Sequence, residues 1–437
     1  MPSLITLIKK TYRMAGPQES RQVMHNVAFL SGLQAITYIL PVLILPYLFR
    51  TIGAEKFGLI SLAQAFVQYF LILTDYGFNV TATKEISLCH NDMTKIRRVF
   101  GAVMTTKLAL MLASILPIAA IVYYVPKFRQ DWMVYALSTG VMVGSTIFPL
   151  WFFQGMEKMK YIAKLNIISE IAYACAIFYF VRSPQDYLMV PVITSLACIA
   201  TGLMAHYIVL TRFGIWVKLY GFKQVWQQLK TGWNLFISVV GINSYTTTRI
   251  FAVGLFTDNT ITGYYSIAEK IANVAQTFPL SSFSQAIFPR LSKIFHRNKL
   301  KAYQMMGQIQ LITVLVSLIC LPILIFVAPA IVRLVCGGEY GEVVLTLRLL
   351  LFAVFFISAN AFRVQFLLVA GKTATYSRIH VYSALAGVPL ILYLIERFSY
   401  VGAAMATVCI EAGVFTLTYF IVRQLRFLPT HPLRGQA

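Results

Sequence analysis

Nine charged residues interrupt stretches of this 437-residue chain that are otherwise apolar. A charge at the centre of a bilayer costs about 2.5 to 3.5 kcal/mol on insertion scales, so such residues usually line a wet cavity or pair with one another. Fixed cations in a cavity can bind an anionic group such as a phosphate, and a carboxyl group can carry a proton. The cations are Lys107, Arg249, Lys270, Arg348 and Arg363, and the carboxylates are Asp75, Glu170, Glu269 and Glu411.

The depth of each cation in its apolar stretch separates the candidates. Arg249, Lys270 and Arg363 lie deep, and we expect them to line a cavity and bind substrate. Lys107 and Arg348 lie nearer to the ends of their stretches, where a long side chain can reach the membrane surface. A structural role and a place in the cavity both remain open for these two.

The four carboxylates are candidates for coupling or gating. A structural, hydrogen-bonded role is the alternative for Asp75. Glu269 directly precedes Lys270, but neighbours on a helix point about 100° apart, so the two charges need not neutralise each other.

Uncharged polar and aromatic residues accompany these charges. Amides, hydroxyls and rings of this kind can bind sugar hydroxyls, and some must also form hydrogen bonds between helices. They include Gln34, Gln64, Gln68, Asn243, Tyr245, Tyr264, Tyr265, Gln276, Gln285, Asn360 and Gln365.

The stretches that hold these residues have the length and composition of membrane-spanning helices. The chain is 58% apolar and 12% charged, with a mean hydropathy of +0.72. A spanning helix needs about 20 mostly apolar residues. The sequence therefore predicts an all-α polytopic membrane protein with twelve spans, at 24–49, 57–80, 98–124, 132–153, 161–181, 187–210, 231–256, 262–289, 306–328, 343–368, 377–395 and 401–422.

The loops between the predicted spans differ in charge from side to side. Of the 37 Lys and Arg residues, 25 fall on the side that holds both termini and seven fall on the other side. The positive-inside rule therefore places both termini in the cytoplasm. The net charge of +22 does not indicate nucleic-acid binding, because no predicted soluble domain is large enough to carry a basic face.

The spans divide into two sets of six. A polar break at 212–230 separates an N-terminal bundle, 1–211, from a C-terminal bundle, 231–437. Gly58-x-x-Ser61 opens the second span and recurs as Gly263-x-x-Ser266 in the eighth. Because both halves begin on the same side, the repeat is parallel, as in transporters that move two bundles about a central cavity.

Catalytic and cofactor motifs are missing from the sequence. Ala370–Thr373 resembles the end of a P-loop, but Phe366 stands where the first glycine is required. No metal-ligand pair or nucleophile motif appears, so we expect neither an enzyme nor a cofactor or metal site. The six cysteines include no Cys-x-x-Cys pair and are interpreted as small apolar residues.

Three segments carry a resemblance to a known family. They are the pattern of Gln34, Pro41, Pro46, Arg50, Gly53 and Phe57-Gly58, then Leu73-Thr74-Asp75-Tyr76-Gly77-Phe78, and then Thr83-Lys84-Glu85-Ile86. With these residues the chain resembles the bacterial polysaccharide repeat-unit flippases, which translocate lipid-linked O-antigen or capsule units. Arg50 and Asp75 match positions of the family pattern, and Arg50 joins the candidate cavity cations.

The resemblance implies a V-shaped pair of bundles in the bacterial cytoplasmic (inner) membrane. Such a protein moves an oligosaccharide on undecaprenyl pyrophosphate to the outer leaflet by alternating access through a cationic cavity, without ATP. Its partners are then the lipid-linked oligosaccharide, membrane lipids and other proteins of glycan assembly. Three alternatives remain: a drug or metabolite exporter of the same superfamily, a flippase for the peptidoglycan precursor, and a membrane enzyme of glycan assembly.

Overall fold

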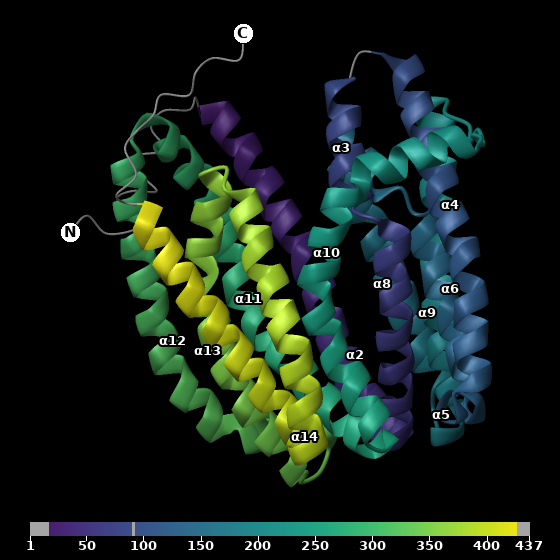
Figure 1. Ribbon diagram of the computed structural model, residues 1–437, viewed down its shortest axis with the longest axis vertical. Helices are drawn as coiled ribbons and strands as arrows, with labels where there is room; N and C mark the ends of the chain where they lie inside the picture. Colours follow the sequence, from purple (N-terminus) through teal and green to yellow (C-terminus); the bar gives the residue numbers. More distant parts are fainter. Residues whose placement is uncertain (1–16, 90–91, 426–437) are drawn as a thin grey trace.

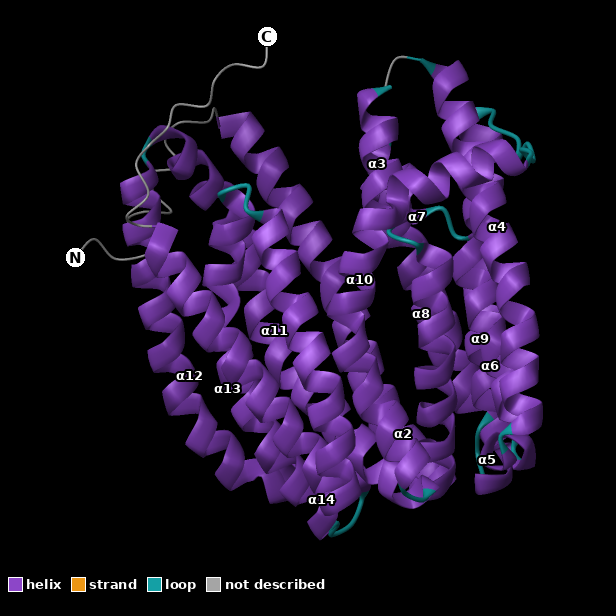
Figure 2. Ribbon diagram, in the orientation of Figure 1, coloured by secondary structure: helices purple, strands orange, loops and turns teal. Residues whose placement is uncertain are grey.

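The computed structural model describes residues 17–89 and 92–425, and within these ranges it consists of helices and short connections, without a β-strand (Figures 1 and 2). The predicted cytosolic segments at the two termini lie largely outside the described residues. The helices are α2 (Pro17–Asp75), α3 (Phe78–Leu88), α4 (Met93–Tyr124), α5 (Pro126–Gln130), α6 (Trp132–Ile147), α7 (Leu150–Gly155), α8 (Met159–Phe180), the 3-10 helix η1 (Pro184–Leu188), α9 (Met189–Phe213), α10 (Phe222–Phe256), α11 (Asn259–Arg297), α12 (Lys299–Cys336), α13 (Gly341–Val369) and α14 (Thr373–Leu425).

The twelve predicted spans fall largely on helix, which confirms the predicted all-α fold class. Eight helical segments of the described residues are long and apolar enough to cross a membrane, and two of them, 40–88 and 374–424, are long enough for two spans each. The helix α2 turns back at Gly53, where φ is 77°, and α14 turns back at Ser399, where φ is 54°. Gly53 adopts this backbone conformation without a steric penalty because it has no Cβ.

Two predicted spans are interrupted before their expected ends. The span at 57–80 stops at Asp75, because Tyr76 (φ 44°) and Gly77 (φ 77°) break the helix before α3 begins. The span at 132–153 stops at Ile147, and Pro149 separates α6 from the short helix α7. Proline supplies no N–H to continue the helix, which explains the second break.

The helices form two packed groups. In the N-terminal group, α2 to α9, the helix α6 packs against α9 and α2, and α8 packs against α9 and α2. In the C-terminal group, α10 to α14, the helix α13 packs against α11, α12 and α14, and α10 packs against α14. The two groups converge at the lower end of the view and diverge towards the upper end, with α2 and α10 between them (Figure 1).

The repeated Gly-x-x-Ser motif lies where α2 crosses α11. A Cβ atom on Gly58 would overlap the carbonyl oxygen of Asn259, and one on Gly263 would overlap that of Ala54, so only glycine permits this approach. Three residues after each glycine, the two serines of the motif meet: the hydroxyls of Ser61 and Ser266 are buried and are hydrogen-bonded at 2.8 Å. The equivalent residues of the two motifs therefore contact each other.

Further polar contacts join the two groups. The hydroxyls of Tyr69 and Thr248 are 2.8 Å apart, and Arg50 donates to the carbonyl oxygens of Val335 (3.1 Å) and Leu334 in the last turn of α12. A cation at this place stabilises the negative end of the α12 dipole. These contacts hold α2 against the C-terminal group.

Candidate functional site

A polar pocket of about 510 Å³ lies inside the C-terminal group, enclosed by α10, α11, α13 and α14. Its polar lining comes from all four helices, so it forms only when the group is packed. The polar and titratable residues of the lining are Tyr245, Thr246, Arg249, Glu269, Asn273, Gln276, Asn360, Gln365, Tyr376, His380, Thr407 and Glu411.

Arg249 connects three of the pocket walls. Its Nε lies 3.5 Å from a carboxylate oxygen of Glu269 on α11, and its Nη1 donates to the hydroxyl of Thr407 on α14 at 3.3 Å. Glu411 lies one turn after Thr407 and lines the same pocket, with 9% of its surface exposed. The pocket thus holds one guanidinium and two carboxylate side chains.

Aromatic rings and unpaired acceptors complete the pocket. The His380 ring lies edge-on to Tyr376, with ring centres 4.5 Å apart, and its Nδ1 is 3.4 Å from the Tyr245 hydroxyl. Asn360 is 5% exposed, and neither its Oδ1 nor the Oε1 of Gln365 has a hydrogen-bond partner among the described residues. Such acceptors are suited to a ligand that carries hydroxyl groups.

The other predicted cations do not gather in this pocket. The Lys270 ammonium lies 4.8 Å from the centre of the Phe57 ring on α2, at the boundary between the two groups. The Arg363 guanidinium lies over Phe415 (4.4 Å) and Tyr419 (5.1 Å) on α14. Cation–π contacts of this kind can hold a charge away from water, so each of these cations has an aromatic contact outside the pocket.

Arg348 and Arg50 lie on exposed positions. The Nε of Arg348 donates to the carbonyl oxygen of Ile325 at 3.2 Å. Pro329 follows four residues after Ile325 and has no N–H, so this carbonyl has no partner within α12. Arg348 therefore supplies a hydrogen bond to a carbonyl oxygen that Pro329 leaves free and, like Arg50 at the end of α12, lies outside the pocket.

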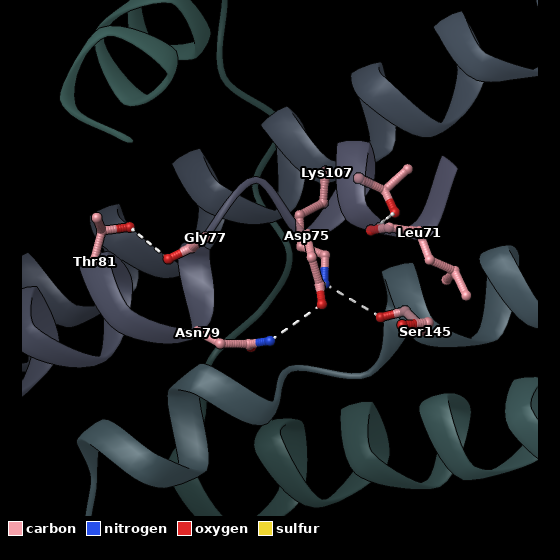
Figure 3. A network of polar contacts seen from close by, with 8 residues as sticks. Leu71, Asp75, Gly77, Asn79, Thr81, Lys107 and Ser145 are labelled. Atoms are coloured by element: carbon pink, nitrogen blue, oxygen red, sulfur yellow. Dashed lines mark hydrogen bonds and ion pairs between the residues drawn. The ribbon is translucent and has the colours of Figure 1, made fainter. Parts of the chain in front are cut away.

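A second ion pair lies in the N-terminal group, between a buried lysine and a carboxylate that is 35% exposed (Figure 3). The Lys107 ammonium is 3.0 Å from Asp75, the last residue of α2, and Lys107 is 1% exposed. It also donates to the carbonyl oxygen of Ser145 at 3.2 Å, which has no helical partner because Pro149 lacks an N–H. The Asn79 amide donates to the other Asp75 oxygen at 3.2 Å.

This ion pair joins the two helix breaks of the N-terminal group. Beyond the breaks, α3 packs on α7, where the Thr83 hydroxyl donates to the Trp151 carbonyl oxygen at 3.2 Å and a Cβ on Gly155 would press against Ile86. Lys107 is therefore placed to hold the ends of α2 and α6 in register. Ser145, which accepts from Lys107, also lines a separate pocket between α6, α8 and α9.

Glu170 lies apart from both ion pairs. It lines a pocket of about 390 Å³ between α6, α8 and α9, together with Ser145, Asn166, Ser169 and Thr201. The structure thus places the four predicted carboxylates in three locations, and only Glu269 and Glu411 share a pocket.

Residues 23–295 match the model of a protein family described as "Polysaccharide biosynthesis protein". The chain is 30% identical over 412 residues to a protein of Escherichia coli (strain K12) assigned as an O-antigen transporter, with 92% of this chain and 97% of the relative covered. The chain belongs to this polysaccharide biosynthesis family. A second protein with the same assignment, from Shigella dysenteriae, is 24% identical, covering 92% of this chain and 99% of the relative.

Solved structures of membrane transporters share the fold of this chain. The lipid II flippase MurJ in an inward closed conformation matches with a TM-score of 0.70, at 12% identity, over 91% of this chain and 87% of that chain. An inward-facing multidrug resistance MATE family transporter of the MOP superfamily matches at 0.69, with 13% identity, over 90% and 96%. An outward-facing MATE structure matches at 0.58, with 14% identity, over 90% and 92%. The predicted resemblance to polysaccharide flippases is confirmed.

Five polar residues of the pocket were not predicted from the sequence: Thr246, Asn273, Tyr376, His380 and Thr407. Thr407 holds the Arg249 guanidinium, and Tyr376 and His380 form part of the wall. Tyr376 and His380 are four residues apart in an apolar stretch and hence lie on one helix face, which was the available signal. Thr407 carries no such signal, because threonine hydroxyls in spans usually bond to their own helix.

Proposed function

We propose that this protein translocates an oligosaccharide repeat unit, linked to undecaprenyl pyrophosphate, across the bacterial cytoplasmic membrane. The observation that carries the proposal is the pocket of Arg249, Glu269 and Glu411 inside a membrane-spanning bundle of a polysaccharide biosynthesis family member. The relatives assigned as O-antigen transporters support this class of substrate. The protein acts as a transporter and needs no catalytic residue or cofactor.

Arg249 is the group proposed to bind the pyrophosphate. Its guanidinium contacts Glu269 in the present conformation, so the phosphate must replace a carboxylate rather than enter an empty cationic site. A guanidinium suits this exchange because its planar donors bind carboxylate and phosphate oxygens with the same geometry. Asn360, Gln365 and the rings of Tyr376 and His380 are then available to the sugar, while the polyprenyl chain stays in the bilayer.

Alternating access is proposed to occur by movement of the two helix groups about the α2–α11 contact, with both termini in the cytoplasm. The higher TM-scores against inward-facing than against outward-facing structures support an inward-facing state. Lys270 lies over Phe57 at this boundary, so separation of α2 from α11 would uncover its ammonium. Lys270 is thus a candidate cavity cation of the opposite state, and Glu269 and Glu411 are the candidate coupling carboxylates.

Complementation of a strain that lacks its repeat-unit flippase tests the proposal. The natural chain is expected to restore surface polysaccharide, and Arg249→Ala at equal membrane abundance is expected to leave undecaprenyl-linked units accumulated at the inner leaflet. Arg348→Ala is the matched control, because this arginine lies outside the pocket. Full activity of Arg249→Ala would refute the assigned role. Absence of accumulation in the deletion strain would instead favour a glycan-assembly enzyme.

Export of a cationic drug or metabolite is the second candidate function. The observation that favours it is the excess of carboxylates in the pocket, where Glu269 and Glu411 face a single guanidinium. Such a lining is suited to a positively charged ligand when both carboxylates are ionised. An exporter would lower the sensitivity of cells to cationic dyes and would leave surface polysaccharide unchanged, so the same strain separates the two functions.

A further inference from the structure

The connection between α9 and α10 displays large apolar side chains on its outside. Exposed fractions are 74% for Trp216, 69% for Leu219, 80% for Phe222 and 59% for Trp226. The helix α10 begins at Phe222, so the second half of the predicted linker, 212–230, is helical. Side chains this apolar would bury themselves if the segment were free to turn.

Other contacts fix the orientation of this connection. Gly214 ends α9 in a left-handed conformation (φ 62°), and Ile215 is 2% exposed among the apolar residues of the N-terminal group. The backbone N–H of Tyr220 donates to the Thr105 hydroxyl on α4 at 3.1 Å, and Gly101 leaves room for the Tyr220 ring. The tryptophans therefore point outward because the segment is held from its other side.

The start of α10 has one aromatic and one basic stripe. Phe222, Trp226 and Trp233 fall within about 40° of one another around the helix, at about 100° per residue, and Phe222 stacks on Trp226 with ring centres 6.3 Å apart. Lys223 and Lys230 follow at about 80° to 100° from Phe222. Both lysines are exposed, as is Lys218 before the helix, and none of the three forms an ion pair within the described residues.

The helix that carries this surface continues to the centre of the molecule. Phe236 stacks on Tyr76, at the break between α2 and α3, with ring centres 4.4 Å apart and planes 8° from parallel. Thirteen residues further along the same helix, Arg249 lines the pocket. A partner bound to the start of α10 would therefore act on the helix that holds the pocket guanidinium.

We propose that the exposed surface of Trp216, Phe222, Trp226, Lys218, Lys223 and Lys230 binds anionic phospholipid at the membrane surface. Aromatic rings prefer the boundary between headgroups and acyl chains, and lysines beside them attract lipid phosphates. Charge selects this partner: three unpaired lysines complement an anionic headgroup. The aromatic stripe continues into the spanning part of α10 through Trp233 and Ile237, both exposed, so the surface is contiguous with the bilayer. The connection is thus a lipid-bound anchor for α10.

Quenching of tryptophan fluorescence by brominated lipids tests this proposal. The full chain carrying Trp132→Phe and Trp233→Phe is reconstituted in nanodiscs of phosphatidylethanolamine that contain brominated phosphatidylglycerol or brominated phosphatidylethanolamine at equal fraction. Of the three remaining tryptophans, Trp151 is fully buried, so the signal comes from Trp216 and Trp226. Stronger quenching by the anionic lipid is the expected result.

Two charge-matched variants complete the test. Lys218→Gln, Lys223→Gln and Lys230→Gln together are expected to abolish the preference for phosphatidylglycerol. Lys158→Gln, Lys160→Gln and Lys164→Gln together, which remove the same exposed charge elsewhere, are expected to keep it. Equal quenching by both lipids in the natural sequence, or a preference that survives the first variant, would overturn the proposal. Absence of quenching by either lipid would also overturn it, since the surface would then face water or a protein.

Discussion

The two helix groups each contain an ion pair with a buried member, and the pairs differ in their surroundings. Lys107 and Asp75 in the N-terminal group are joined by Asn79 and the Ser145 carbonyl, so the ammonium has protein partners for two of its donors. Arg249 and Glu269 in the C-terminal group line a pocket with a second carboxylate and two unpaired acceptor atoms. A buried charge in a membrane protein is therefore not by itself a sign of a substrate site.

Replacing both charged residues of an ion pair by neutral ones is expected to give the largest difference in transport between the two pairs. Arg249→Gln with Glu269→Gln removes one positive and one negative charge, so the net charge of the pocket is unchanged and the protein should keep its membrane abundance. Transport should nevertheless be lost, because no cation remains in the pocket for the phosphate. Asp75→Asn with Lys107→Met should keep both abundance and transport. Surface polysaccharide and immunoblots of membranes measure the two quantities. Normal transport by the Arg249 and Glu269 double variant would show that neither ion pair is needed to bind substrate.

Removal of one partner should affect the Lys107 pair mainly through stability. Asp75→Ala leaves an ammonium that is 1% exposed without its carboxylate, at an expected cost of roughly 3 kcal/mol. Thermal unfolding in detergent, followed by tryptophan fluorescence, should show a lower midpoint than for Glu170→Ala. Glu170 is the matched carboxylate, because no ion pair involves it within the described residues. Equal midpoints would show that the Lys107 pair does not hold the helix breaks together.

Substitution of a glycine at the α2–α11 crossing should have an intermediate effect on stability. Gly58→Ala places a methyl group on the Asn259 carbonyl, so α2 and α11 must move apart, at a cost of roughly 1 to 3 kcal/mol in this conformation. Gly413→Ala is the control, since a Cβ there meets nothing within 4 Å. Accessibility of a cysteine introduced at Ser61 should rise in the first variant only. Unchanged accessibility would mean that the crossing tolerates a side chain.

Substitution of the exposed arginine on α13 should have the smallest effect on transport and stability. Arg348→Ala removes one hydrogen bond to the Ile325 carbonyl, worth about 0.5 to 1.5 kcal/mol, and leaves an acceptor that water or lipid headgroups can reach. Transport at the natural level and a small shift in the unfolding midpoint are expected. Loss of transport comparable to that of Arg249→Ala would bring Arg348 back among the substrate-binding cations.

The spans were predictable from sequence because hydrophobic length is a property of each stretch alone. The break at Tyr76 and Gly77 was not predicted, although Asp75, Gly77 and Asn79 are residues that interrupt an apolar stretch. The directions of neighbouring side chains were partly predictable. Glu269 faces Arg249 while Lys270 faces Phe57, as their angular separation on a helix requires.

The grouping of the charges depended on how the helices pack. Depth in a span suggested that Arg249, Lys270 and Arg363 would share one cavity, but depth says nothing about rotation around the helix axis. Arg363 is turned towards Phe415 and Tyr419, and Lys270 towards α2. The pairing of Lys107 with Asp75 follows from two helix breaks that meet in space, and neither break was predicted.

The contact of Ser61 with Ser266 bears on how the two halves of this chain arose. Equivalent residues of two repeats that touch each other form an isologous contact, the kind that two identical subunits make across a two-fold axis. A six-span chain carrying one copy of Gly-x-x-Ser would possess the whole of this contact as a homodimer. Duplication and fusion would then have preserved an existing subunit interface as the place where the two halves of one polypeptide meet.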